Sequence, residues 1–266
     1  MITVNGASAV DWLGSCPSGH GVPVALCHCG SPMRRDGAGC TGSAKHPLRK
    51  RQLLMYASRT MTRRNLGEIA ARGWRLLASP GQLSRTTTLP PLSYALDNGA
   101  WTAHTQGSEF DGAAYRKALD LWAHGADWIA LPDVVMGGVR SLRLSLSWVR
   151  EVRRYHRPML FVVQDGMRPD REGRIIEDLG LRGAFVGGST EWKESSLPEW
   201  GAWAHEAGAH LHVGRVNSIR RIRLCLSAGA HSADGTSVTR FASTAAKLDT
   251  AALGAQVELL APNGAA

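Results

Sequence analysis

Eight short apolar runs, most of them separated by amphipathic stretches of helical length, constrain the fold of this 266-residue chain more than any other feature. The apolar runs span residues 53–57, 74–78, 94–96, 128–131, 159–163, 184–186, 210–213 and 231–233. The helical stretches span residues 60–72, 110–124, 139–155, 170–180, 194–207, 217–228 and about 244–260, and a polar, proline-containing loop spans 79–91. Such alternation is typical of parallel strands joined by crossover helices.

Eight strands are the number that closes a parallel sheet into a barrel surrounded by helices. We therefore expect an α/β fold, a (β/α)8 TIM-like barrel over residues 49–262, preceded by a cysteine-rich arm over residues 1–48. An open, doubly wound sheet is the alternative, and the number of strands disfavours it. The first 48 residues are rich in Gly, Ser, Pro and Cys and show no hydrophobic period, which is typical of a loop-rich segment.

Four of the five cysteines lie within the first 40 residues, at positions Cys16, Cys27, Cys29 and Cys40. An odd number of cysteines gathered at one end argues against a disulfide framework, whereas thiolates are good zinc ligands. We expect these four residues to bind a structural Zn²⁺ that orders the arm, and we expect no organic cofactor. Because the spacing is not that of a standard zinc knuckle, a disordered arm with incidental thiols is the alternative.

The net charge of +9 is concentrated in one part of the sequence. Residues 31–75 contain eleven Lys or Arg and two acidic residues, so this segment alone accounts for the whole excess. A basic segment on an otherwise neutral chain favours binding to nucleic-acid phosphates, and the alternative is a solvated surface that keeps the protein soluble. The candidate contacts are Arg49, Lys50, Arg51, Arg63 and Arg64.

Composition favours a soluble, cytoplasmic protein. Hydrophobic residues make up 44% of the chain and charged residues 20%, as in ordinary globular domains. No apolar run reaches the roughly 18 residues that a membrane span needs, and the N-terminus lacks the pattern of a secretory signal. We expect no membrane partner, and the sequence leaves the oligomeric state open.

Polar residues or glycines follow nearly every predicted strand. In chain order they are Ser58, Ser79, Asp97-Asn98-Gly99, Asp133, Gln164-Asp165-Gly166, Gly187-Gly188-Ser189, Gly214-Arg215 and Asp234-Gly235. A turn or a helix N-cap explains any one of them, but a parallel barrel brings all of its strand ends to one rim, where active sites are built. Four aspartates and a glutamine on that rim predict a catalytic site.

These residue types favour glycosyl or nucleobase chemistry. One carboxylate can attack an anomeric carbon while a second carboxyl moves protons, and the candidates are Asp234 and Asp97. Asp133 and Gln164 offer the acceptor and donor groups that the edge of a purine requires. The backbone of Gly187-Gly188 permits the close approach of a flat ligand.

Five short motifs, in the same order along the chain, resemble those of the tRNA-guanine transglycosylase superfamily. They are Asp97-Asn98-Gly99-Ala100-Trp101, Asp133 after the next strand, Val163-Gln164-Asp165-Gly166, Val186-Gly187-Gly188, and the run from Asp234 to Thr239-Arg240. The resemblance covers roughly residues 53–245 as an ordered series, which is more specific than any single motif.

The resemblance implies roles for the matching positions. Asp234 matches the family's nucleophile and Asp97 its general acid and base. Asp133 and Gln164 match residues that recognise the base, and the backbone of Gly187-Gly188 matches the pair of glycines that meets it.

Departures from the family narrow the expected substrate. The tRNA-acting enzymes carry a late zinc site of three cysteines and a histidine, whereas this chain has only Cys225 in that region. A short barrel without that module is more similar to the DNA-acting, DpdA-type branch, which exchanges guanine in phage or bacterial DNA for a 7-deazaguanine such as preQ0. We expect Trp101 to stack on the base or to pack at the barrel mouth, and Arg240 to contact nucleic acid.

We therefore expect a DNA-guanine transglycosylase, a glycosyltransferase that flips guanine out of double-stranded DNA and replaces it with a free 7-deazaguanine base. A tRNA-acting transglycosylase is the first alternative. A nucleic-acid-binding barrel without catalysis and a small-molecule glycosidase are the others.

Overall fold

The structure is a computed structural model that describes residues 53–58, 62–83, 88–236, 247–249 and 251–252. All of these belong to one compact unit, Arg51–Ala266. Most of the helix predicted over 244–260, the boundary predicted near residue 48, and several predicted site residues lie outside the described residues. These site residues are Cys16, Cys27, Cys29, Cys40, Arg49, Lys50, Arg51 and Arg240.

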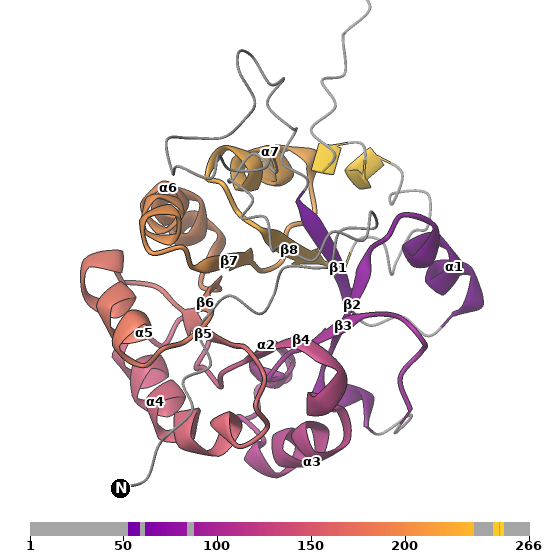
Figure 1. The fold of residues 1–266 in the computed structure, drawn as a ribbon, viewed down its shortest axis with the longest axis horizontal. Coiled ribbons are helices and arrows are strands. Elements are labelled where there is room, and N and C mark those ends of the chain that lie inside the picture. Colours follow the sequence, from indigo (N-terminus) through magenta and orange to yellow (C-terminus); the bar gives the residue numbers. More distant parts are fainter. Residues whose placement is uncertain (1–52, 59–61, 84–87, 237–246, 250, 253–266) are drawn as a thin grey trace, which may run out of the picture. The chain divides into compact units, whose positions relative to one another are not determined.

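Eight parallel strands form a closed barrel in which each strand pairs with its sequence neighbours and the first strand pairs with the last. The strands are β1 (Leu54–Ser58), β2 (Arg75–Ala78), β3 (Tyr94–Leu96), β4 (Ala126–Ala130), β5 (Met159–Val163), β6 (Gly183–Val186), β7 (His210–Val213) and β8 (Ser232–Gly235). Figure 1 shows the strands at the centre with helices around them. Every strand overlaps a predicted apolar run, so the predicted (β/α)8 barrel is confirmed.

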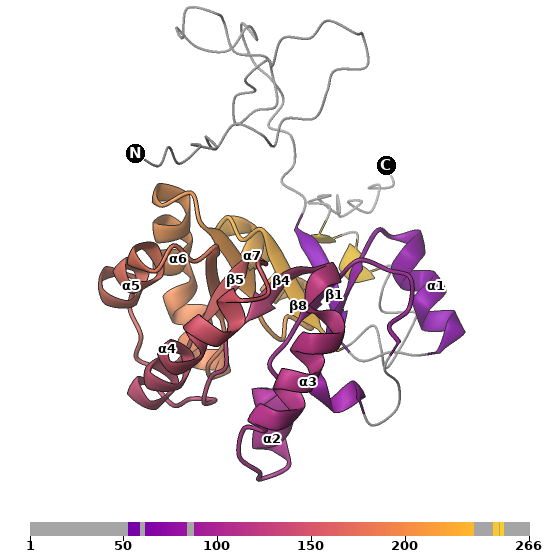
Figure 2. The ribbon, with the colours of Figure 1, turned by 60° about the horizontal axis from the view of Figure 1, so that its bottom comes forward.

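Helices connect most of the strands and pack on the outside of the barrel (Figure 2). They are α1 (Arg63–Ala71), α2 (Ala100–Thr105), α3 (Gly112–Trp122), α4 (Val139–Arg153), α5 (Arg174–Asp178), α6 (Thr190–Glu206) and α7 (Ile219–Ser227). Short turns of other helical types span Pro80–Gln82, Ala123–Gly125 and Pro169–Gly173. The sequence missed α2, because six residues are too few to show a helical period.

Polar side chains at the N-termini explain where several helices begin. Thr62, Asp111, Ser189 and Ser218 precede α1, α3, α6 and α7, and each accepts a hydrogen bond from a backbone N–H in the first turn. Such caps satisfy donors that the helix itself leaves unpaired.

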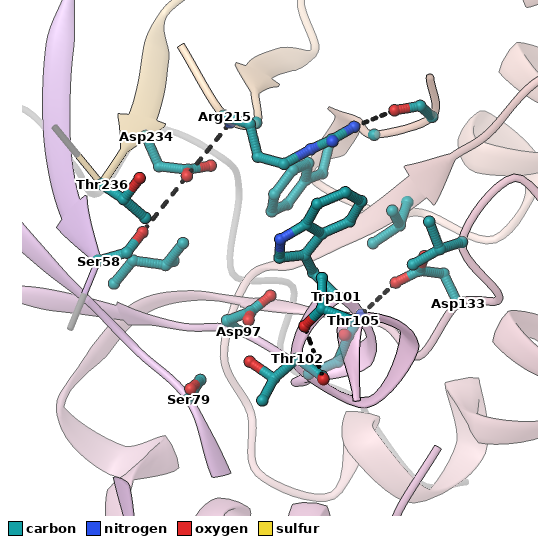
Figure 3. Close-up of a pocket in the computed structure, with 18 of the residues that line it drawn as sticks. Ser58, Ser79, Asp97, Trp101, Thr102, Thr105, Asp133, Arg215, Asp234 and Thr236 are labelled. Atoms are coloured by element: carbon teal, nitrogen blue, oxygen red, sulfur yellow. Dashed lines mark hydrogen bonds between the residues drawn. The ribbon is translucent and has the colours of Figure 1, made fainter. Parts of the chain in front are cut away.

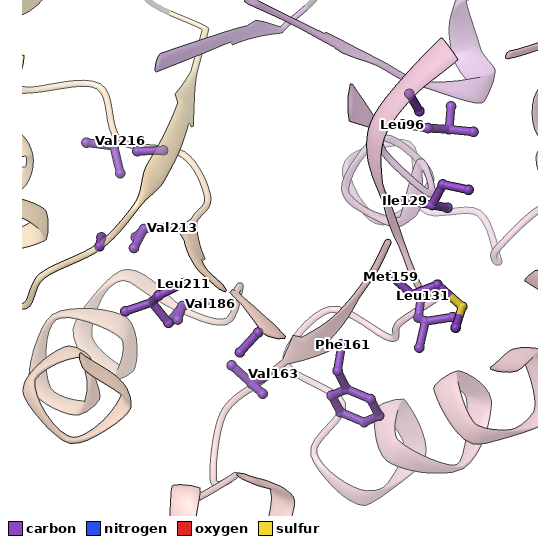
Figure 4. Packing of buried hydrophobic residues seen from close by; sticks show 14 of the residues in the cluster. Leu96, Ile129, Leu131, Met159, Phe161, Val163, Val186, Leu211, Val213 and Val216 are labelled. Carbon is purple, nitrogen blue, oxygen red and sulfur yellow. The ribbon is translucent and has the colours of Figure 1, made fainter. Parts of the chain in front are cut away.

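The strands are buried on both faces, which explains their continuous apolar character. In β5, Met159, Phe161 and Val163 belong to the cluster between strands and helices, whereas Leu160 and Val162 point into the barrel. Figure 4 shows part of the outer cluster, including residues from β3 to β7. Alternate residues of one strand therefore serve two separate layers of the core.

Four rings fill much of the barrel interior, beside the branched aliphatic residues Leu77, Leu160 and Val162 that are usual in this fold. The rings of Trp128 and His212 are 4.7 Å apart between centroids, those of Phe185 and His212 are 4.5 Å apart, and those of Tyr56 and Trp128 are 5.4 Å apart. Phe185 also lines the cavity at the C-terminal rim, so this aromatic layer forms part of the cavity floor.

Close packing of α6 against the end of α7 leaves no room for a side chain at Gly201. A Cβ atom there would lie 2.2 Å from the Ala228 carbonyl oxygen. We expect Gly201→Ala to lower the free energy of unfolding by about 1–3 kcal/mol, measured by urea denaturation.

Gly67→Ala in α1 is the matched control, since a Cβ atom at that position meets nothing within 4 Å. It should raise the free energy of unfolding by roughly 0.5–1 kcal/mol, because alanine favours a helix over glycine. Equal effects of the two substitutions would contradict the packing between α6 and α7.

Candidate active site

A cavity of about 530 Å³ opens at the C-terminal ends of the strands (Figure 3). Its size is within the range of sites that hold a small molecule or a single nucleotide. All eight strands or the residues directly after them contribute to its wall, through Ser58, Leu77, Asp97, Asp133, Gln164, Phe185, Gly214 and Asp234 among others.

The barrel brings together all seven residues that the sequence predicted for catalysis and base binding. Asp97, Trp101, Asp133, Gln164, Gly187, Gly188 and Asp234 all line the cavity. Arg63 and Arg64 lie apart from it, exposed on α1.

Asp165, the fourth aspartate on the rim, does not line the cavity. Its carboxylate accepts hydrogen bonds from the backbone N–H of Ser189 at 2.8 Å and from the Ser189 hydroxyl at 2.5 Å. Asp165 therefore holds the start of α6, which is the structural role that a single rim aspartate often has.

Asp234 is buried in the wall of the cavity and is surrounded by hydrogen-bond donors. Its Oδ1 lies 3.4 Å from the Ser58 hydroxyl and 3.3 Å from the Arg215 backbone nitrogen, and its Oδ2 lies 3.1 Å from Nε2 of His212. These contacts hold the carboxylate in one orientation at the cavity wall. Asp234 pairs with Tyr56 within β8, so it belongs to the strand itself and does not follow it as the sequence predicted.

A chain of hydrogen bonds leads from Asp234 into the barrel. Burial lowers the pKa of His212 below its ordinary value, so the ring is neutral and its contact with Asp234 is a hydrogen bond and not an ion pair. The Ser232 hydroxyl lies 2.8 Å from Nδ1 of His212 and 2.8 Å from Nε2 of His210. Each group has a partner if His210 donates to Ser232, Ser232 donates to His212, and His212 donates to Asp234.

The sequence assigned no role to either histidine. The alternation in β7 carries a usable signal, because His210 and His212 must share one face of the strand. The sequence does not show which residue lies beside His212, because Ser232 becomes its neighbour only when β7 and β8 pair.

Asp97 lies at the end of β3 in a different electrostatic environment. Burial raises the pKa of Asp97 to about 7, and the negative charges of Asp234 and Asp133 act in the same direction. The Gly99 N–H, 3.3 Å from Oδ2, opposes this rise only in part. A carboxyl with a pKa near neutrality can both donate and accept a proton.

Asp133 is held in place by two side-chain amides. Asn98 Nδ2 donates to Oδ1 at 2.7 Å, and Gln164 Nε2 donates to Oδ2 at 2.6 Å. Gln164 Oε1 in turn accepts from the Met136 N–H at 2.9 Å. Burial raises the pKa of Asp133 to about 6, although both amides and Arg215 favour its charged form. The two predicted base-binding side chains are thus oriented in the cavity wall, and Asn98, which the sequence did not single out, is one of their supports.

The two adjacent glycines are required by contacts within the protein. A Cβ atom at Gly187 would lie 2.5 Å from Gln164 Nε2, and one at Gly188 would lie 2.5 Å from the Trp192 ring. Their small size therefore permits this packing, whatever else approaches them from the cavity.

Arg215 extends across the cavity mouth from the loop after β7 to α2. Its guanidinium lies 3.8 Å from the centroid of the Trp101 ring, and its Nη2 donates to the Gly188 carbonyl oxygen. Figure 3 shows the two side chains stacked at the centre of the cavity. Trp101 is 42% exposed, so one face of its ring is covered by Arg215 and part of the ring is open to solvent.

Among the described residues, no group of three or more His, Cys, Asp or Glu side chains is arranged to hold a metal ion. Cys225 is buried with a free thiol, and burial raises its pKa to about 12. No helix in the described ranges combines the length and the apolar character that crossing a membrane requires.

Comparison with protein-family models finds no match, and comparison with curated proteins finds none either. Among solved structures, the chain is similar to the YdjI aldolase from Escherichia coli K12, with 13% sequence identity and a TM-score of 0.48. The match covers 77% of this chain and 88% of that one. A likeness this distant says nothing of the reaction, which has to be inferred from the residues of the cavity.

The raised pKa of Asp97 makes protein stability depend on pH. Between about pH 4 and pH 7 the folded state keeps the Asp97 proton and the unfolded state does not, so the wild type loses stability as the pH rises through this window. Asp97→Asn removes this loss. We expect the variant to gain roughly 2–4 kcal/mol relative to the wild type between pH 4 and pH 8, measured by urea denaturation.

Asp170→Asn is the control, since Asp170 is a surface carboxylate that is solvated in both states. A difference between Asp97→Asn and the wild type that stays constant from pH 4 to pH 8 would show that Asp97 is not desolvated in the folded protein.

Proposed function

We propose that this chain is an enzyme, a DNA-guanine transglycosylase that exchanges guanine in DNA for a 7-deazaguanine base. The observation that carries the proposal is the pair Asp97 and Asp234, which line one cavity in different environments. Donors surround Asp234 as a nucleophilic carboxylate requires, and Asp97 has the near-neutral pKa of an acid and base.

In the first step, an oxygen of Asp234 attacks C1′ of the flipped nucleotide and the bond from C1′ to N9 of guanine breaks. The electron pair of that bond goes to guanine, and protonated Asp97 supplies a proton to the leaving base. The sugar is then joined to Asp234 as an ester, and Asp97 is a carboxylate.

In the second step, Asp97 takes the N9 proton of the incoming base. N9 attacks C1′, the ester bond breaks, and Asp234 is restored as a carboxylate. The exchange consumes no oxidant or reductant and needs no organic cofactor. The hydrogen bonds from His212 and Arg215 hold Asp234 in one orientation through both steps.

Base recognition is assigned to the wall opposite Asp234. Asp133 accepts from donors on a purine edge, Gln164 orients Asp133, and Gly187-Gly188 bound the space beside them. Trp101 offers a ring for stacking once Arg215 moves from its face. The same residues suit guanine in tRNA, so the assay has to compare DNA and tRNA as substrates.

We expect Asp234→Ala to abolish both base exchange and any covalent adduct between protein and nucleic acid. Asp97→Asn should lower the exchange rate by about 10²–10⁴-fold, because it removes the proton transfer but leaves the nucleophile. The assay follows labelled guanine or preQ0 into duplex DNA and, separately, into tRNA, with nucleoside mass spectrometry of the product.

Asp127→Asn is the matched control, because Asp127 pairs with Arg75 at the N-terminal start of β4, away from the cavity. It should exchange bases within a few-fold of the wild-type rate. Exchange at the wild-type rate by Asp234→Ala would rule out the proposed covalent mechanism.

A further inference from the structure

Helix α4 carries a concentration of positive charge that the sequence pattern did not emphasise. Residues 139–157 contain six arginines and a single acidic residue, Glu151. The charge balance along the chain placed the whole excess in residues 31–75, because acidic residues elsewhere cancel the arginines of α4 in number. In the described part of the folded protein, however, those acidic residues do not lie beside the exposed arginines of α4.

Four of these arginines form a line along the exposed face of the helix. Arg140, Arg143, Arg150 and Arg154 occupy positions i, i+3, i+10 and i+14, which share one side of an α-helix, and all four are exposed. We call these four residues the α4 arginine stripe. Ser147, also exposed, fills the position between Arg143 and Arg150.

None of the four stripe residues forms an ion pair with any residue that the structure describes. The single acid of the helix is already neutralised, because Glu151 binds Arg116 through two contacts, at 2.6 Å and 3.3 Å. Arginines on the other side of the barrel differ, since Arg220 and Arg221 both pair with Glu194. The stripe therefore keeps its full charge toward solvent.

The stripe leads toward the cavity. Helix α4 begins after Gly138, in the loop where the Met136 N–H donates to the cavity residue Gln164. From there its 15 residues run about 22 Å down the outside of the barrel. That length matches several successive phosphates of one nucleic-acid strand, which follow one another at about 3.4 Å along a duplex axis.

The chemistry of the stripe fits phosphodiesters better than a lipid surface. The apolar residues of α4 face the barrel, where Trp148, Val149 and Val152 are buried. Only Val139 and Leu146 on this helix are large, apolar and exposed. A helix that binds a bilayer needs a broad apolar face to insert, whereas unpaired guanidinium groups on a polar face are what a phosphate backbone binds.

We propose that the α4 arginine stripe is a docking surface for the phosphodiester backbone of a nucleic acid, next to the cavity that receives the flipped nucleotide. The inference rests on the proposed function in assuming that a nucleic acid is the substrate. It extends that function by assigning the surface that holds the strand outside the active site.

The test compares two double variants of the full chain that lose the same charge. Arg143→Gln/Arg150→Gln changes the stripe. Arg182→Gln/Arg223→Gln, the control, changes two exposed arginines outside it: Arg182 directly precedes β6, and Arg223 lies on α7 in another sector of the barrel (Figure 1). Binding to a fluorescent 20-bp DNA duplex and to an RNA hairpin is measured by anisotropy as a function of salt.

The stripe variant is expected to bind about 10–100-fold more weakly at 0.1 M salt, with a salt slope reduced in magnitude by about two. The Arg182→Gln/Arg223→Gln variant should stay within a few-fold of the wild type. Arg143→Lys/Arg150→Lys keeps the charge and should retain most of the affinity, which separates loss of charge from damage to the helix. Either DNA or RNA as the preferred ligand supports the proposal.

Equal weakening by both double variants would reduce the effect to net charge and overturn the proposal, as would no effect of the stripe variant. Binding to phosphatidylserine vesicles that depends on the stripe, without binding to nucleic acid, would overturn it in favour of a membrane. Base exchange is measured separately, so the two proposals fail independently. Stripe-dependent binding without any exchange refutes the transglycosylase alone, and exchange with stripe-independent binding refutes the docking surface alone.

Discussion

Pairing between β1 and β8 is the interaction on which the rest of the structure depends. It closes the sheet, aligns Tyr56 with Asp234, and brings Ser58 within 3.4 Å of a carboxylate that lies 176 positions later in the chain. Closure also directs every strand end to one rim, so that Asp97 and Asp234 line the same cavity. Without it, β8 would be the far edge of an open sheet, five strands away from β3, and Asp97 and Asp234 would not share a cavity.

The barrel gives chemically identical side chains different properties. Asp234 receives three hydrogen-bond donors, two of them side chains. Asp97 has only backbone donors, and burial together with two neighbouring carboxylates raises its pKa to about 7. Asp133 accepts hydrogen bonds from two side-chain amides, and burial raises its pKa to about 6. Asp165 holds Ser189, the N-cap residue of α6. Four aspartates on one rim thus have distinct roles because burial and donors differ over a few ångströms.

The aromatic side chains at the floor of the cavity also help to give the rim aspartates different environments. Rings of Trp128, Phe185 and His212 fill the barrel below Asp234, and a neutral imidazole there provides a hydrogen bond without adding charge. A cavity with an apolar floor and a polar wall strengthens every electrostatic interaction inside it. Arg215 places a positive charge at the mouth of the cavity. Its backbone adopts the left-handed conformation, with φ 59°, and local strain of this kind tends to occur at functional sites.

Much of the candidate site was predictable from strand ends. The period of apolar residues located all eight strands, and the residues that follow them include Asp97, Asp133 and Gln164. The supports of these residues were not predictable, because Asn98, His212 and Ser232 are recognisable only by what they contact. Helix α2 was missed for a different reason, since a six-residue helix stabilised by tertiary contacts has no periodic signal of its own.

The sequence by itself determined the alternation of strands and helices, and with it the class of fold, because hydrophobic periodicity is a local property of the chain. Tertiary structure alone decided which acid is tied to a histidine, which has its pKa raised, and which holds the N-cap residue of a helix. It also decided that the arginines of α4 lie together without acidic partners, although acids elsewhere balance them in number. Charge and proton affinity depend on distances through space, and those distances are set only when the strands and helices pack together.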